Sequence, residues 1–361
     1  MPLRRPSPRL FSLRPVALRL AAPVLALLLA SCSSAPAPVA NVPPPPPPPA
    51  APSVAISPKL IGMASAYRGY MTRTTAIKPD FADGDGVARS LQAGSAYNPD
   101  QLVRGAIAYA AVAALQDRTF VEGLRVYARD RTQRQQVAYE LLKDPAYALG
   151  LPGAASAAGL AIAALGGDGQ RLYDEGKAVK QAAYDIQKQP WSKETVADRD
   201  QRLAGAKGLA SAAMLGDAGE TARLQQASTA GGLGLTGAAA AAPYTPTVAR
   251  GLAIAALAAL GEAGDANVET ILGLMNEPNV GRCMSMSKLN LYQCLAVARP
   301  HYEDVFCLGQ HAMMDTGRCM IKASGLPEPY EARFIPDAKS IARSYTPPKK
   351  PTPPRKGRRK G

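Results

Sequence analysis

Apolar residues in the body of the chain recur at helical intervals. Leucine or alanine residues stand three to four positions apart after Asn98 and Pro99, at Leu102, Ala106, Ala110 and Ala113. Asn is a favoured N-cap and Pro a favoured first helical residue, so a helix is predicted to start at Pro99. No sustained run of alternating β-branched residues occurs between residues 58 and 345. The sequence therefore predicts an all-α body.

Other helix starts carry similar signals. Thr245 precedes Pro246 and an apolar segment over residues 248–260, which repeats the pattern of Asn98 and Pro99. The pairs Thr119 with Glu122 and Asp217 with Glu220 fit the capping box, in which two side chains satisfy the first backbone N–H groups of a helix.

A theme of small residues recurs four times. Similar Gly- and Ala-rich segments cover residues 105–115, 159–166, 208–216 and 251–257. Their starts are 54, 49 and 43 residues apart, a spacing that fits one helical hairpin per unit of a solenoid. An Ala-rich composition alone also produces such an echo. The predicted fold is an Ala/Gly-rich helical bundle or an irregular helical-hairpin solenoid.

The last three of these segments run into Gly followed by an acidic residue. Gly supplies the left-handed C-cap of a helix, and the acid suits the start of the next one, so each is predicted to be a helix stop.

Two stretches, Pro145–Gly167 and Leu224–Ala249, contain no charged residue. Gly and Ala enter lipid less readily than Leu or Ile, and both stretches contain Pro or clustered Gly. Buried helices and Gly-rich loops are therefore expected, with a glycine-zipper pore as the alternative.

Residues 1–31 have the composition of a targeting peptide. They contain five Arg and no acidic residue, and they end in an apolar run from Leu20 to Ala30. About 11 apolar residues are too few to span a bilayer, whereas a basic segment followed by a short apolar one is typical of a secretory signal.

The sequence Leu29-Ala30-Ser31-Cys32 at the end of this segment resembles the lipobox of bacterial lipoproteins. The resemblance implies that Cys32 becomes the acylated N-terminal residue of the mature protein, with the two lipid anchors that stable membrane attachment needs. Ser33 after the cysteine implies the outer membrane. The expected location is the cell envelope, at the outer membrane and facing the periplasm.

Residues 32–57 are predicted to form a disordered linker. The segment is rich in Pro, Ala, Ser and Val and includes seven consecutive prolines, Pro43–Pro49. Such a composition favours polyproline II, which would hold the body about 60 Å from the membrane.

The charge of the chain lies at its ends. The net charge is +14, but residues 54–345 carry only +2, and residues 346–361 hold seven cations and no acid. A Pro-rich cationic tail is expected to be disordered and to bind anions. The candidate anion-binding residues are Lys349, Lys350, Arg355, Lys356, Arg358, Arg359 and Lys360. Peptidoglycan or lipopolysaccharide is the expected partner. Nucleic acid is not expected, because an exported protein would meet only imported or extracellular DNA, and without stacking aromatic residues the tail would bind it only electrostatically.

Four further cysteines lie close together: Cys283, Cys294, Cys307 and Cys319. An exported protein enters an oxidising space, so two disulfides are expected, with three alternative connectivities. Sequence proximity favours Cys283–Cys294 and Cys307–Cys319. The predicted domains are a helical part over residues 58–280 and a disulfide-stapled helical part over residues 281–345.

The same region contains His301 and His311, which raises a zinc hypothesis, although no two of the cysteines have the close spacing of structural zinc sites. Several methionines raise a copper(I) hypothesis: Met284, Met286, Met313, Met314 and Met320.

Signs of catalysis are weak. The segment His301-Tyr302-Glu303-Asp304 is a compact polar group for which capping or a surface role is preferred, and Asp83-Gly84-Asp85-Gly86 is interpreted as a turn because it lacks the remaining ligands of a calcium loop. No nucleophile elbow, zinc-protease helix or nucleotide loop occurs. Neither enzymatic activity nor a cofactor is expected.

Taken together, the sequence predicts a lipid-anchored structural or assembly protein of the cell envelope, with its tail on peptidoglycan or another anionic polymer. The alternative is a protein-binding accessory subunit of an envelope or secretion complex. A third hypothesis is a metal carrier or enzyme centred on residues 283–320.

Overall fold

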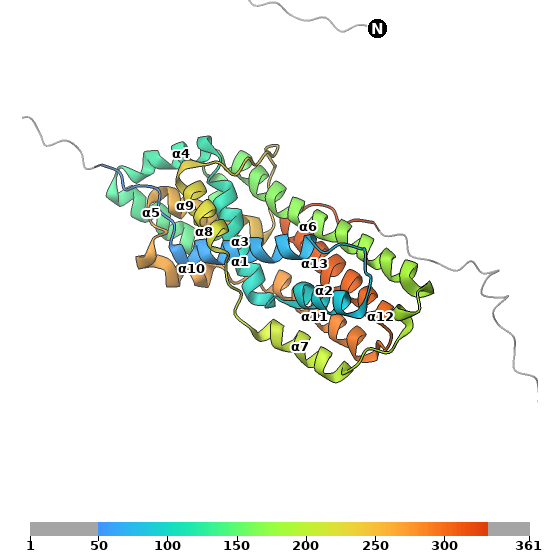
Figure 1. Cartoon of the computed structure of the whole chain (residues 1–361). Coiled ribbons are helices and arrows are strands. Elements are labelled where there is room, and N and C mark those ends of the chain that lie inside the picture. Colours follow the sequence, from blue (N-terminus) through green and yellow to red (C-terminus); the bar gives the residue numbers. More distant parts are fainter. Residues whose placement is uncertain (1–49, 331–361) are drawn as a thin grey trace, which may run out of the picture. The chain divides into compact units, whose positions relative to one another are not determined.

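The computed structural model describes residues 50–330, and within this range every regular element is a helix (Figure 1). The predicted all-α fold is confirmed. The α-helices in chain order are α1 (Pro58–Thr75), α2 (Gly84–Ser95), α3 (Pro99–Ala114), α4 (Arg118–Ala128), α5 (Arg131–Lys143), α6 (Ala154–Asp185), α7 (Arg199–Ser211), α8 (Ala218–Ala230), α9 (Pro246–Leu260), α10 (Val268–Leu274), α11 (Pro278–Val297), α12 (His301–Cys307) and α13 (Thr316–Ser324). Shorter segments are the 3-10 helices η1 (Pro145–Gly150), η2 (Ile186–Lys188), η3 (Trp191–Lys193) and η4 (Asp265–Asn267), and the π-helix η5 (Leu308–Asp315).

The predicted targeting peptide, the predicted lipidation site Cys32, the run of seven prolines and the cationic segment 346–361 lie outside the described residues. The end of the predicted linker is described, and it contacts the body. The backbone N–H of Ala55 donates to the Ala258 carbonyl at 3.1 Å, and that of Ser57 donates to the Ala263 carbonyl at 2.7 Å. The side chain of Ile56 is buried. The last residues of the predicted linker, from Ala55 to Ser57, therefore pack on the helical body.

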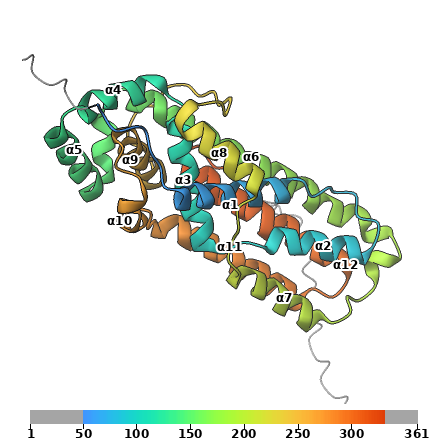
Figure 2. The same ribbon diagram turned by 60° about the vertical axis from the view of Figure 1, so that its left-hand side comes forward.

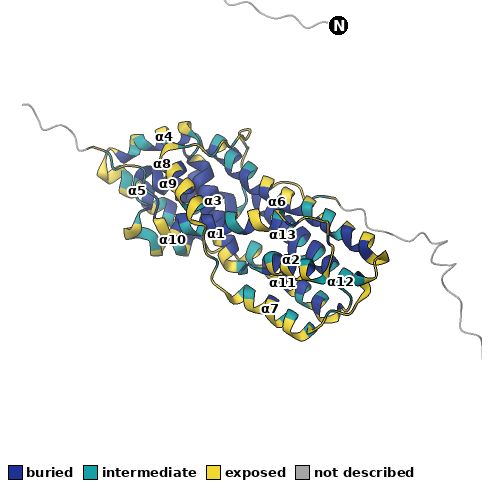
Figure 3. Cartoon of the chain, in the orientation of Figure 1, coloured by how far each residue is buried: buried dark blue, intermediate teal, exposed yellow. Residues whose placement is uncertain are grey.

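Helices α3 and α9 form the centre of the core, and nearly all of their residues are buried (Figure 3). They approach closely because their contacts are small: a Cβ on Gly251 of α9 would lie 2.7 Å from the Cβ of Ala110. On α3, a Cβ on Gly105 would lie 2.6 Å from the Met63 carbonyl oxygen of α1. Backbone proximity thus replaces large side chains in this Ala-rich core.

Three of the predicted caps are confirmed. Asn98, Thr245 and Asp217 each accept a hydrogen bond from the backbone N–H three residues further on, at 3.1, 3.3 and 2.9 Å. The predicted capping role of Thr119 was wrong. Helix α4 begins at Arg118 and is capped by Asp117, a stronger N-cap residue that lies two positions earlier.

The predicted helix stops had different outcomes. Gly261 is the left-handed C-cap of α9, with φ of 81°, as expected. Helix α7 ends at Ser211, before Gly216. Helix α6 does not stop near Gly166 but continues to Asp185, because its glycines lie against α13: a Cβ on Gly169 would lie 2.9 Å from the Gly317 carbonyl oxygen.

The four small-residue segments fall in α3, α6, α7 and α9, which are not equivalent units. Helices α3 and α9 are buried, whereas only Ala206 of α7 is. Of the two predicted folds, the helical bundle describes the body better than the solenoid of repeated hairpins. Of the uncharged stretches, one forms η1 and the first half of α6, and the other comprises the end of α8, a Gly-rich loop over residues 231–245 and the first turn of α9. Nowhere between residues 50 and 330 is a helix both long and apolar enough to cross a bilayer.

The C-terminal helices pack on one another and on α6. Helix α11 pairs with the continuous rod formed by α12, η5 and α13, and this rod lies along α6 (Figure 2). One hydrophobic core contains buried side chains from both predicted domains, including Leu165 and Leu291. Helix α7 lies on the outer side of α11 and is largely exposed.

Candidate functional site

A cleft between α2 and α7 has a volume of about 1100 Å³. The loop over residues 194–198 and the first turn of α12 also line it. Its walls come from segments far apart in the sequence. The lining residues are Asp83, Gly84, Asp85, Val87, Ala88, Leu91, Gln92, Ser95, Glu194, Thr195, Val196, Ala197, Asp198, Gln201, Arg202, Gly205, Ala206, Gly208, Leu209, His301 and Asp304.

The cleft combines an acidic rim with a small, apolar floor. Five carboxylates line it and only one guanidinium, that of Arg202. Buried Val87 and Leu91 of α2 form the floor, and on the α7 wall Leu209 lies among glycines that leave room close to the backbone. A body with almost no net charge therefore gathers negative charge at this cleft, which favours cationic ligands.

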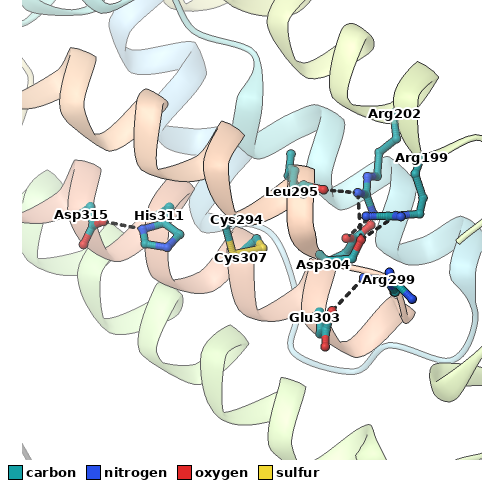
Figure 4. Close-up of a disulfide and its surroundings, with 11 residues drawn as sticks. Arg199, Arg202, Cys294, Leu295, Arg299, Glu303, Asp304, Cys307, His311 and Asp315 are labelled. Carbon is teal, nitrogen blue, oxygen red and sulfur yellow. Dashed lines mark hydrogen bonds and ion pairs between the residues drawn. A yellow bond between two sulfur atoms is a disulfide. The ribbon is translucent and has the colours of Figure 1, made fainter. Parts of the chain in front are cut away.

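Two arginines fix the first turn of α7 to the junction between α11 and α12 (Figure 4). Arg199 donates to the carbonyl oxygens of Ala298 at 2.8 Å and Ala296 at 2.9 Å. Arg202 donates to the Asp304 carboxylate at 2.5 Å and also to the Leu295 carbonyl. Burial raises the pKa of Asp304, although Arg202 opposes this rise.

The far end of α7 is attached to α3 and its N-cap. The Asn98 amide donates to the Ala210 carbonyl at 3.2 Å, and the Gln101 side chain accepts from the Met214 N–H at 2.7 Å. Between these attachments, α7 buries only Ala206. Helix α7 is thus a wall held at its ends, and the cleft is the space behind its middle.

The polar group at His301 has structural partners. Glu303 accepts from the Arg299 N–H at 2.7 Å, and Asp304 pairs with Arg202. The His301 ring lies against Gly84, where a Cβ would come within 2.4 Å of its Cε1 atom. Glu303 thus binds a backbone N–H that lies just before α12.

The segment Asp83-Gly84-Asp85-Gly86 forms the start of α2. Asp83 is the N-cap and accepts from the Gly86 N–H at 2.7 Å. The two motifs that the sequence analysis treated separately, at residues 83–86 and 301–304, meet at one end of the cleft.

All four cysteines of the C-terminal part form disulfides, but the favoured pairing was wrong. The bonds are Cys283–Cys319 and Cys294–Cys307. Cys283 and Cys294 both lie on α11, where eleven residues span about 16 Å, which is too far for a disulfide. Cys307 and Cys319 are likewise separated along one rod of helices. The bonds therefore join facing helices.

The residues of the metal hypotheses are dispersed. In the described part of the chain, no group of three or more His, Cys, Asp or Glu side chains is arranged to hold a metal ion. His311 pairs with Asp315, with 2.8 Å between Nδ1 and Oδ2. Four of the five methionines are fully buried, and Met286 is exposed.

Lys288 was not found from the sequence. Lys288 lies on α11, and its amino group is buried against the end of α2. The amino group donates to the Ser95 carbonyl and lies 3.8 Å from the centre of the Tyr97 ring. Burial lowers the pKa of Lys288 to about 7. In the sequence Lys288 follows Ser285-Met286-Ser287, a largely polar segment that is typical of a solvent-exposed helix face. The sequence pattern therefore did not indicate that Lys288 is buried.

The lipobox-like segment is the one family resemblance in the sequence, and the body adds no other. No protein-family model matches the chain, and no curated protein and no solved structure matches it.

Proposed function

We propose that this protein is a lipid-anchored structural or assembly component of the cell envelope, and that its helical body binds a cationic segment of a partner protein. The cleft between α2 and α7 carries this proposal, because carboxylates outnumber cations there by five to one. The two disulfides support an exported protein, since such bonds persist in oxidising compartments. Cys32 is the proposed anchor at the outer membrane.

The chemistry of the cleft suggests the kind of segment that fits. Four of its five carboxylates, those of Asp83, Asp85, Glu194 and Asp198, belong to exposed residues on the rim. Lys or Arg side chains of the ligand would lie at this rim, and small apolar residues would lie on the floor. The long-range attraction would speed association and weaken with salt.

Charge neutralisation at the rim tests this proposal. The probe is a fluorescent twelve-residue peptide of alternating Lys and Ala, and its binding to the mature protein is measured by anisotropy at low ionic strength. The variant combines Asp83→Asn, Asp85→Asn and Glu194→Gln. Asn keeps the capping ability of Asp83. Since an exposed ion pair contributes roughly 0.5 kcal/mol, binding should weaken about tenfold.

A matched control removes three charges elsewhere: Asp130→Asn, which keeps the N-cap of α5, with Glu122→Gln and Glu140→Gln. The control should bind within about twofold of the unchanged protein. If both triple variants bind the peptide equally weakly, binding depends only on the net charge of the protein, and the cleft is not the binding site.

The cationic tail is proposed to contact peptidoglycan or lipopolysaccharide. Its support is the gathering of seven cations in residues 346–361 while the body is nearly neutral. Deleting residues 346–361 should reduce co-sedimentation of the protein with purified sacculi at low salt, because the contact is electrostatic. A tail with all seven cations replaced by Gln should behave like the deletion. Unchanged sedimentation of both variants would exclude the tail from envelope binding.

A further inference from the structure

A second, smaller cavity of about 350 Å³ lies where α6, α11 and α12 meet, and the Cys294–Cys307 disulfide forms part of its wall. Both cysteines line it, together with apolar and aromatic side chains from all three helices. The other lining residues are Ala183, Tyr184, Gln187, Val297, Ala298, Tyr302, Glu303 and Phe306. Cys307 is fully buried, whereas Cys294 is partly exposed.

Large apolar side chains stand exposed beside this disulfide. Val297 is 74% exposed and Tyr184 is 48% exposed, and both belong to the cavity wall. Thiol–disulfide exchange needs access of the attacking thiolate to a sulfur atom, which the partly exposed Cys294 offers. The apolar, concave surface beside it provides area that a protein partner can contact.

We propose that Cys294–Cys307 is an exchange site for a protein dithiol, and that the apolar surface around Val297 and Tyr184 is where this oxidoreductase docks. A thiolate of the partner attacks Sγ of Cys294. The bond to Sγ of Cys307 breaks, a mixed disulfide forms, and Cys307 leaves as a thiolate that takes up a proton. The second thiol of the partner then attacks the mixed disulfide. Two electrons and two protons have passed from the partner to the two cysteines, and the partner is left as a disulfide.

Opening this disulfide would also affect the cleft, because the residues that follow Cys294 hold α7 in place. The carbonyl groups that hold Arg199 and Arg202 of α7 belong to Leu295, Ala296 and Ala298, which follow this cysteine closely in the chain. Figure 4 shows Leu295 beside the arginines. Asp304, the carboxylate partner of Arg202, lies one turn before Cys307. The disulfide thus ties together the two helix ends that anchor α7. Opening it loosens that wall of the cleft.

The order of exchange is the first test. The native protein is treated with a thioredoxin whose second active-site cysteine is replaced by Ser, so that the mixed disulfide persists, and peptide mapping locates the bond. We expect it on Cys294. Val297→Ser, which changes only an exposed side chain, should slow this trapping several-fold and leave reduction by dithiothreitol unchanged. Trapping on Cys283 or Cys319, or equal trapping of Val297→Ser, would overturn the proposal.

The second disulfide provides a matched control for the effect on α7. Backbone hydrogen exchange is compared between Cys294→Ser/Cys307→Ser and Cys283→Ser/Cys319→Ser. Exchange over residues 194–211 should rise several-fold in the first variant only. An equal rise in both, or none in the first, would separate the disulfide from α7. Neither readout uses the cationic peptide, so failure of the proposed cleft function would not affect them.

If the Cys294→Ser/Cys307→Ser protein does not fold, the same exchange measurement on the unmodified protein after partial reduction replaces it. Molecules reduced only at Cys294 and Cys307 are then compared with fully oxidised molecules. Unchanged exchange over residues 194–211 would again contradict the coupling.

Discussion

Gly309→Ala should lower the free energy of unfolding by about 2 to 3 kcal/mol, the usual cost of adding atoms to a tightly packed core. A Cβ on Gly309 would lie 2.5 Å from the Lys180 backbone nitrogen and 2.9 Å from the Gly176 carbonyl oxygen of α6. Both obstacles are backbone atoms, so no side chain can rotate away and the two helices must separate. Gly176→Ala should have a similar effect, because its Cβ would lie 2.8 Å from the Met314 nitrogen.

Urea denaturation with both disulfides intact measures this effect, and Gly167→Ala is the control. Gly167 is an exposed residue of the same helix α6, and a Cβ there would meet no atom within 4 Å. Alanine should stabilise the protein at this position by up to ~1 kcal/mol, through helix propensity. If Gly309→Ala has the same free energy of unfolding as Gly167→Ala, α6 and η5 do not approach each other as closely as described.

The stability of the protein should rise between pH 7 and pH 9.5, and Lys288 is the expected cause. Burial lowers the pKa of Lys288 from its ordinary value of 10.5 to about 7 in the folded chain. Between these two values the unfolded chain binds a proton that the folded chain does not, so raising the pH favours folding. One such proton corresponds to about 1.4 kcal/mol per pH unit at most.

Above pH 10 the trend should reverse. Burial raises the pKa values of Tyr67, Tyr70 and Tyr97, so these side chains stay neutral in the folded chain while they ionise in the unfolded one. Their contribution to stability is complete below pH 10 and is lost as the pH rises through their folded pKa values. Stability should therefore be greatest near the ordinary tyrosine pKa.

Lys288→Met tests the assignment, because Met fills a similar volume without a titrating group. The Ser95 carbonyl keeps the hydrogen bond from the Tyr97 N–H at 2.9 Å. The variant should lose most of the rise in stability between pH 7 and 9.5 and should be more stable than the unchanged protein at pH 6. Lys193→Met, at an exposed position, should keep the rise. A rise that persists in Lys288→Met would place its origin at another group.

Features that depend on a few neighbouring residues could be predicted from the sequence. The N-caps Asn98, Thr245 and Asp217 act on N–H groups three residues away, so the local pattern contains both partners. The C-cap Gly261 was predictable for the same reason. The course of α6 was not, because its glycines are explained by contacts with Gly309 and Gly317, far along the chain.

The candidate site depends almost wholly on such distant contacts. Asp83, Glu194 and Asp304 are ordinary charged residues in the sequence, and only the packing of α2, α7 and α12 brings them to one cleft. The four disulfide cysteines could be predicted from their positions in the chain, but their pairing could not, since the pairing depends on which helices face each other. Lys288 lacked any signal because burial, not its neighbours in the chain, sets its chemistry.

The π-helix η5 sets which face of the C-terminal rod is turned toward α6. Gly169 and Gly176 on α6 are seven residues apart and share a helix face, but their partners Gly317 and Gly309 are eight apart. In an uninterrupted α-helix, eight positions correspond to a turn of about 80° away from that face. The wider turns of η5 absorb the extra residue. Without it, Gly317 would rotate off α6 and Cys319 would no longer face Cys283. The one extra residue in η5 thus orients both the glycines that contact α6 and the cysteine that bonds to Cys283.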